Sequence, residues 1–522
     1  MEKNSIRCFR NFVPERMRLW IMILWSFVFL LSGASHMATM NMQVGRFSFI
    51  QEDATMIGFM AFIGMNISFP MLFRLRFRFT TRELMLASSF VVILCHICLL
   101  ATDNVALLCC VSLVAGFFRM LAVFEAMVCI QLIVTPSRNY AIFYSVVFVI
   151  VQGSSQLFTP VITDIVCHSS WIYFQWIVIL SLVITAIFIM VLIRHYREGK
   201  RIPLYGIDWL GFILWGVILT ALLFIMTYGK YLEWGHSLHI RFAIIILTAA
   251  SILQYMNIKS IKRPYINPAA WKYPKLMKIF VLFGAIYIIQ AAPGMLQNPY
   301  MGSVLKLDQQ NISYLSYFSL GGMIISALLC YTFFRKRKRL RGIIISGYCL
   351  FIVYLVMMYF YINPECNIEK FYFPAFIRGF ALLWLYIILT LYISYIVPFV
   401  HNFQSLCIIG FMRMSLGTPI GMSLIDNMLL YLQRKNLTVL NSEIDSLNLR
   451  AIEMPYNDLV SLVNQQIYMV SVKEIFGYLI IGAVILLIMM LFERRVQINN
   501  FKYSFPSMKQ IRQLARHLLN PQ

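Results

Sequence analysis

Fourteen apolar runs, each long enough at about 20 residues to cross the hydrocarbon core of a bilayer, constrain this chain more than any other feature. They begin near Leu19, Asp53, Glu83, Val105, Tyr140, Trp171, Asp208, Ile240, Leu276, Ile312, Gly342, Phe371, Phe403 and Glu474. A backbone in lipid must satisfy its own hydrogen bonds, so runs of this length predict helices. The composition, 60% hydrophobic and 12% charged, excludes an ordinary soluble enzyme. We predict an all-α membrane protein with 14 transmembrane helices.

The basic residues lie mainly on one side of this predicted topology. Of the 44 lysines and arginines, 32 fall in the termini and in the loops that share their side, 9 fall in the opposite loops and 3 lie within spans. Positive loops face the cytoplasm. The sequence therefore predicts a multi-pass protein of the cell (inner) membrane with both termini cytoplasmic. The net charge of +23 is then a topology signal, and we expect no nucleic-acid partner.

Motifs for cofactors are not apparent in the sequence. The 11 cysteines have no metal-ligand spacing, and no P-loop glycine motif is present. We expect no metal, no cofactor and no direct ATP hydrolysis. Cys167 and Cys366 fall in predicted outer loops, where a disulfide between them is the less favoured alternative to two free thiols.

The fourth span carries two charged residues, Arg119 and Glu125. A charge at bilayer depth costs at least about 2.5 kcal/mol, so such residues usually face a partner or a watery cavity. Six residues separate them, which places them about 120° apart around the helix and excludes a simple i,i+4 pair. One hypothesis makes Glu125 a proton carrier that Arg119 tunes. The other is a buried ion pair that holds helices in register.

Other polar residues within spans are candidates for the substrate cavity or for proton coupling. The cavity candidates are Gln152, Gln156, Gln290, Arg378, Trp384 and Arg413. Asp426, near the predicted outer end of span 13, is a further coupling candidate. The aromatic residues of span 12 either line a cavity for flat, apolar cargo or face lipid and packed positions.

Three prolines interrupt predicted spans: Pro160 in span 5, Pro293 in span 9 and Pro419 in span 13. Proline removes a backbone donor and kinks a helix. Glycine, serine or threonine stand beside each of them, which is typical of helices whose freed backbone groups are satisfied by neighbours or water. We expect kinks or gating positions at these three sites.

Several stretches in a fixed order resemble one transporter family. They are Phe117–Arg119, Thr159–Pro160, Ser170–Phe174, Asp208–Gly211, Phe376–Phe380, Phe411–Arg413 and Gln465–Ser471. Together they resemble the fourteen-span drug:proton antiporters of the major facilitator superfamily, the EmrB/QacA type. The resemblance implies a major facilitator fold and proton-coupled export of amphipathic compounds. The aspartate that such transporters carry in span 1 has no counterpart between Trp25 and Met40, which shifts the proton role to Glu125 in a divergent branch.

The resemblance also implies a division of the chain. Residues 1–201 form an N-terminal six-helix half, 202–263 two additional central spans, 264–494 a C-terminal six-helix half, and 495–522 a basic cytoplasmic tail. A two-fold plan agrees with this division, because Arg119 of span 4 corresponds to Arg378 of span 12. The segment 433–473 is expected to be the longest outer loop, in which the run from Leu447 to Val463 is a candidate for a short surface helix. It is either a solvated loop or, as in Gram-negative relatives, a contact for a periplasmic adaptor protein.

The sequence therefore predicts a secondary active transporter, with a small-molecule substrate, protons and the lipid bilayer as partners. Efflux of amphipathic drugs or toxic compounds is the first reading. A transporter of a specific metabolite or of a lipid-linked compound is the alternative. A membrane enzyme is the least favoured class, and Asp164 with His168 is the nearest candidate for a catalytic pair.

Overall fold

The computed structural model describes residues 8–47, 49–134, 140–196, 204, 206–261, 263–267, 274–336, 340–397, 399–443 and 455–492. Within these ranges it contains 14 helices long and apolar enough to cross a membrane. The predicted all-α membrane fold is confirmed. We call the two ends of the helices inner and outer according to the predicted topology.

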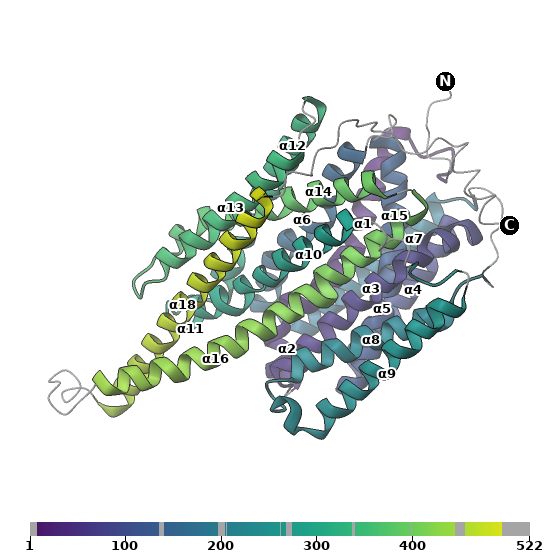
Figure 1. The fold of residues 1–522 in the computed structure, drawn as a ribbon. Coiled ribbons are helices and arrows are strands. Elements are labelled where there is room, and N and C mark those ends of the chain that lie inside the picture. Colours follow the sequence, from purple (N-terminus) through teal and green to yellow (C-terminus); the bar gives the residue numbers. More distant parts are fainter. Residues whose placement is uncertain are drawn as a thin grey trace.

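The N-terminal half consists of six long helices and one short one (Figure 1). They are α1 (Glu15–Ala38), α2 (Met40–Phe47), α3 (Gln51–Arg78), α4 (Thr81–Ala101), α5 (Val105–Val134), α6 (Tyr140–His168) and α7 (Trp171–Leu192). Local sequence fixes their starts. Thr80 accepts a hydrogen bond from the amide of Glu83 at 3.2 Å, and the Glu83 carboxylate accepts one from the amide of Thr80 at 2.9 Å. This capping box begins α4 directly after α3.

The two additional spans form a hairpin of α8 (Trp209–Tyr228) and α9 (Leu238–Ser260), with the one-turn η1 (Trp234–His236) between them. Asp208 fixes the inner end of the hairpin. Its carboxylate accepts hydrogen bonds from the amide of Gly211 at 2.7 Å, from the Asn257 side chain at 3.0 Å and from the amide of Tyr265 at 3.0 Å. One buried carboxylate thus caps α8, ties it to α9 and holds the segment that follows.

The C-terminal half repeats the plan of six spans, two of which contain a π-helical turn. Its helices are α10 (Pro274–Ile289), η3 (Pro293–Gln297), α11 (Asn298–Ser303), α12 (Gln309–Lys336), α13 (Leu340–Tyr361), η4 (Ile368–Phe371), α14 (Tyr372–Ile396), α15 (Phe399–Gly410), η5 (Phe411–Gly417), α16 (Thr418–Glu443) and α18 (Tyr456–Phe492). Both η3 and η5 are π-helical turns inside spans 9 and 13. Such turns occur frequently at functional sites.

Two pairs of glycines reveal the internal symmetry. Gly64 of α3 and Gly116 of α5 lie so close to the opposite helix that an added Cβ would stand 2.0 Å from a backbone carbonyl oxygen. Gly322 of α12 and Gly379 of α14 make the same contact, at 2.1 and 2.0 Å. Helices approach this closely only where a side chain is missing. Spans 2 and 4 therefore pack in the way that spans 10 and 12 do.

The outer segment 433–473 is not a loop over its described residues, so this prediction was wrong. Helix α16 continues to Glu443, and α18 already begins at Tyr456. Figure 1 shows the two helices projecting together beyond the bundle, at the lower left. The Asn436 amide donates to the Ser471 hydroxyl at 3.0 Å, which joins the two. Polar residues ended the apolar runs but did not end the helices, and the hydrogen bond between Asn436 and Ser471 connects the two helices in this polar region. Residues 444–454 and the tail 495–522 lie outside the described residues.

Candidate substrate site between the two halves

The two halves contact each other near both ends of α6. At the outer end, the Asp164 carboxylate of α6 accepts hydrogen bonds from the Tyr314 hydroxyl at 3.0 Å and from the Gln310 amide, both on α12. Near the inner end, the hydroxyls of Tyr144 on α6 and Ser394 on α14 lie 2.7 Å apart. Residues between these contacts are therefore enclosed by the interface.

Arg413 lies in this enclosed region, on the π-turn η5. Its Nη1 donates to the Tyr386 hydroxyl of α14 at 3.0 Å. With the Gln152 amide turned so that its oxygen faces the guanidinium, that oxygen accepts from Arg413 Nη2 at 2.9 Å and also from Nη1. The guanidinium carbon is 5.1 Å from the ring centre of Tyr386 and 5.8 Å from that of Tyr287 on α10. Arg413 is thus held by both halves, since Gln152 belongs to α6.

All these partners of Arg413 are uncharged. Among the described residues, no carboxylate lies within ion-pair distance of its guanidinium. Its Nε is buried and has no hydrogen-bond partner among them. Arg413 as a whole is partly buried, and a poorly solvated cation whose charge is not balanced is costly, since aromatic faces and neutral acceptors offset only part of that cost. The arrangement leaves Arg413 able to bind a further acceptor.

Aromatic rings and two further amides surround the arginine. The ring centre of Phe148 lies 4.4 Å from the ring centre of Tyr386, and the ring centre of Phe283 lies 5.7 Å from that of Tyr386. The side-chain oxygens of Gln156 and Gln290 are buried, with no hydrogen-bond partner among the described residues. Gln156 stands one turn beyond Gln152 on α6, so it projects on the same face of that helix. The sequence named both glutamines as cavity candidates.

Two other predicted cavity residues lie elsewhere. Arg378 interacts with Tyr354 of α13, and Tyr354 also donates to Gln297 of η3 at 3.0 Å, all inside the C-terminal half. The indole of Trp384 donates to the Ile343 carbonyl of α13 at 2.9 Å. Both side chains therefore connect helices within that half, whereas Arg413 and Gln152 meet across the interface. Sequence reasoning did not single out Tyr287, because one tyrosine in an apolar run carries no distinguishing signal.

Arg119 and Glu125 do not contact each other, as their angular separation predicted. Arg119 is buried and donates to the Ser32 hydroxyl at 3.0 Å and to the Ser32 carbonyl at 3.1 Å, both on α1. Glu125 is 1% exposed and accepts from Arg76 at 3.0 Å and from Thr81 at 3.0 Å. The cation in contact with Glu125 is therefore Arg76 and not Arg119, and an electrostatic effect of Arg119 on Glu125 stays a prediction. The sequence pattern predicts that Arg76 belongs to the basic inner loop Arg74–Glu83 between spans 2 and 3, but α3 is long enough to carry it into the bundle.

The remaining predicted positions lie at element junctions. Asp426 of α16 forms an ion pair of 2.7 Å with Lys230, just after α8, so it joins the C-terminal half to the hairpin. Pro160 lies inside α6, Pro293 is the first residue of η3, and Pro419 is the second residue of α16, directly after η5. Two of the three prolines thus adjoin π-turns, and their gating role stays a prediction.

Cysteine and metal chemistry is not apparent in the part of the chain that the structure describes. Cys167 is an exposed free thiol and Cys366 a buried one, so no disulfide joins them. Within the described ranges, no group of three metal-ligating side chains comes together. The Asp164 carboxylate is engaged by α12, while His168 Nδ1 bonds the backbone carbonyl of Asp164 at 2.9 Å. These two residues therefore do not form a catalytic pair.

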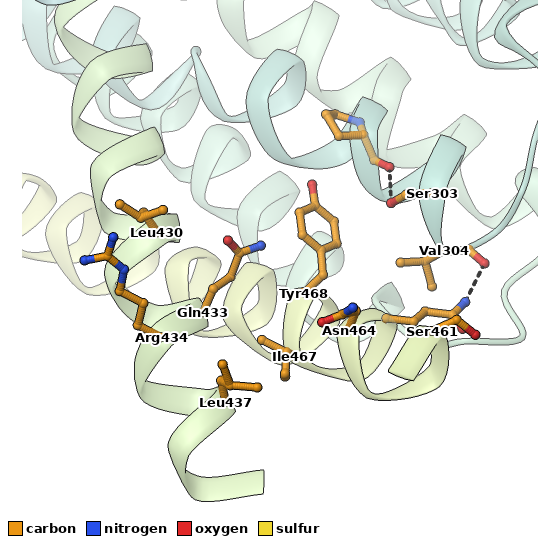
Figure 2. Close-up of a pocket in the computed structure, with 12 residues that line it drawn as sticks. Ser303, Val304, Leu430, Gln433, Arg434, Leu437, Ser461, Asn464, Ile467 and Tyr468 are labelled. Atoms are coloured by element: carbon orange, nitrogen blue, oxygen red, sulfur yellow. Dashed lines mark hydrogen bonds between the residues drawn. The ribbon is translucent and has the colours of Figure 1, made fainter. Parts of the chain in front are cut away.

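A separate cavity lies at the base of the projecting helices, between α11, α16 and α18 (Figure 2). Its volume is about 600 Å³. Tyr468, Asn464 and Gln433 line it, and Gln465 at its edge donates to the Val304 carbonyl at 2.9 Å. These residues belong to the C-terminal half alone, so the cavity is distinct from the interface around Arg413.

Comparisons with known proteins agree with this architecture. No family model matches the chain, and no curated protein matches it in sequence. A solved structure of the nucleoside transporter NupG aligns with a TM-score of 0.52 and 12% identity, covering 92% of this chain and 100% of that one. A POT family transporter in complex with 5-aminolevulinic acid aligns with a TM-score of 0.59 and 13% identity, covering 94% and 99%. A structure described as a proton dependent oligopeptide transporter gives 0.57 and 12%, covering 91% and 97%.

Identities of this size show the fold and not the substrate, and the drug:proton antiporter branch stays a prediction. Both groups of solved neighbours are of the major facilitator type. The chain accordingly has the major facilitator fold, with two six-helix halves and two additional spans.

Proposed function

We propose that this protein is a secondary active transporter that moves a small molecule across the cell membrane by alternating access of its two halves. The observation that carries the proposal is Arg413, a charged residue held by both halves in the middle of their interface. Charged groups at membrane depth mark substrate or ion pathways. The major facilitator fold supports the same hypothesis, as do the solved neighbours, which are transporters.

Alternating access requires that the contacts at the two ends break in turn. Opening outward separates Asp164 from Tyr314, and opening inward separates Tyr144 from Ser394. Each contact consists of hydrogen bonds worth about 1 kcal/mol net, or somewhat more where a carboxylate accepts. Such contacts close a passage and still allow it to open. Rocking of two repeats about a central site is the general mechanism of this class.

Glu125 is the proposed proton site. Its carboxylate balances Arg76 and lies where α3, α4 and α5 meet near their inner ends. Protonation removes the charge partner of a buried arginine and so favours a rearrangement of these helix ends. The structural alternative, an ion pair that only fixes α3 against α5, predicts no effect on proton coupling. Export of an amphipathic compound, with both termini in the cytoplasm, remains the proposed direction.

The test is transport by the purified protein in liposomes that enclose a pH-sensitive dye. A substrate added on one side is expected to move protons in the wild-type protein. Glu125→Gln is expected to abolish accumulation driven by a pH gradient while retaining exchange of substrate at equal pH. Glu369→Gln, at an exposed acid outside the bundle, is the matched control. Full gradient-driven transport by Glu125→Gln would show that Glu125 does not couple proton movement to transport. If no added compound changed the dye signal, the proposed transport function would be contradicted.

A further inference from the structure

We propose that the transported compound carries an anionic group, a carboxylate or a phosphate, and that Arg413 binds this group in the centre of the protein. The proposal rests on the proposed transport function and specifies its substrate class. The flat or apolar body of the compound would lie against the rings of Tyr386 and Phe148.

Arg413 has no balancing negative charge among the described residues of the interface. Arg413 receives only a hydroxyl, an amide oxygen and two ring faces from the described residues, and its buried Nε has no partner there. Arg76, by contrast, has the Glu125 carboxylate at 3.0 Å. A cation left without a counter-charge in a low-dielectric interior gains strongly from an anion. The missing counter-charge at Arg413 is the one that a substrate would supply.

Arg413 also differs from the buried Arg119 in its position, because it contacts both halves of the protein. Arg119 also has neutral partners, but its hydrogen bonds among the described residues go to Ser32 of the same half. Arg413 is bonded by Gln152 of one half and Tyr386 of the other. Only a residue with partners on both sides of the interface loses one set of them when the halves separate. Opening of the interface therefore exposes Arg413 and not Arg119.

The Gln152 oxygen indicates where the anion binds. It accepts from both terminal nitrogens of Arg413, which is the position that one carboxylate or phosphate oxygen takes on a guanidinium. An ionised oxygen makes hydrogen bonds about twice as strong as those of a neutral amide. The substrate would thus displace Gln152 as the halves separate, and Gln152 would return when the substrate has left. The π-turn that carries Arg413 positions it at this point of the helix.

The same charge excludes lipophilic cations. A cationic drug at this site would meet a partly buried like charge with no carboxylate beside it among the described residues. Like charges at close range in a poorly solvated site repel each other strongly. Drug exporters for dyes and quaternary amines would need an acid here, so the site favours organic anions.

The experiment is ligand-induced stabilisation of the purified full chain in detergent, with probes that share a body and differ in charge. Indole-3-acetate, indole-3-acetamide and tryptamine form one set; phenyl phosphate, benzoate, benzamide and benzylamine form a second. At millimolar concentration, anionic members are expected to raise the unfolding temperature and the others are not. Comparison of phenyl phosphate with benzoate separates the two anion types.

Substitutions test whether the stabilisation by anions depends on Arg413. Arg413→Gln is expected to weaken anion binding at least about 30-fold, and Arg413→Lys to retain part of it. Arg241→Gln, at an exposed arginine bonded to the Gly235 carbonyl, is the matched control and should bind as wild type. Gln152→Leu removes the competing oxygen and should bind anions several-fold more tightly.

Three results would overturn the proposal: stabilisation by neutral or cationic members as large as by anionic ones, no stabilisation by any anionic member, or unchanged anion binding in Arg413→Gln. Weaker binding in Gln152→Leu would overturn the displacement step. The measurement needs no gradient and no transport. A protein that binds anions through Arg413 but moves no protons in liposomes would therefore contradict the proposed function alone.

Discussion

The close approach of α12 and α14 gives a sharp prediction, because adjacent glycines on α12 differ in what a methyl group would meet. A Cβ added at Gly322 would lie 2.1 Å from the Phe376 carbonyl oxygen and 2.8 Å from the Phe380 amide nitrogen. A Cβ added at Gly321 would meet nothing nearer than a Phe376 ring carbon at 3.9 Å. Ordinary van der Waals contact begins at 3.4 Å. Gly322→Ala must therefore push the two helices apart by about 1.3 Å.

The energetic cost follows from this displacement. Overpacking of a well-packed core costs about 1–3 kcal/mol, and the obstacle here is backbone, which cannot rotate away. A gap of about 1 Å also forfeits a quarter to a half of each dispersion contact along the helix pair. We expect Gly322→Ala to lose about 3 kcal/mol, which for a chain of this length lowers the unfolding temperature of the purified protein by roughly 3 °C.

The assay is thermal unfolding in detergent, with Gly321→Ala as the control at the neighbouring position. Gly321→Ala should unfold at the wild-type temperature or slightly above it, since alanine is the better helix former. Gly64→Ala and Gly116→Ala should repeat the loss in the N-terminal half. Equal unfolding temperatures for the Gly322 and Gly321 variants would refute the close helix approach and the symmetry argued from it.

Three further predictions concern the outer and inner surfaces. Reversing one charge of the pair between Lys230 and Asp426 should lower the unfolding temperature, and the double variant with exchanged charges should restore most of it; no restoration would show that the two side chains do not interact. Thr80→Ala removes the cap of α4 and should cost about 1 kcal/mol in thermal unfolding, whereas an unchanged midpoint would contradict the cap. Burial raises the pKa of the Cys366 thiol, so maleimide should label Cys366 more slowly than the exposed Cys167 at neutral pH, and its rate should keep rising into alkaline pH. Peptide mapping measures both rates, and equal labelling would contradict the burial.

The number of spans was predictable from the sequence because apolar length alone specifies a membrane helix. The same criterion failed at 433–473, where α16 and α18 continue as helices after their apolar runs end. Hydropathy marks where a chain leaves lipid, and does not mark where a helix stops. The helix ends in this region depend on contacts between two segments, such as Asn436 with Ser471, that periodicity does not show.

The candidate site was predictable in part. Arg413 and Gln152 were selected because polar groups within spans are costly, and the structure brings them together. The same rule selected Arg378, which instead interacts with Tyr354 inside one half. The free-energy cost of placing a polar group in the membrane identifies which residues need a partner, but it does not identify the partner. Arg76 shows the converse, because a residue assigned to a loop became the partner of Glu125.

Distances across the two ends of the interface test the central claim most directly. Spin labels placed by a non-cysteine method at the exposed Ser169 and Asp308 report the outer ends of α6 and α12, and labels at the exposed Arg78 and Thr332 report the inner ends of α3 and α12. Double electron–electron resonance in lipid, with the pH changed and with a stabilising anion added, is expected to show one distance lengthen as the other shortens. Two distances that stay fixed, or that lengthen together, would contradict alternating access around Arg413.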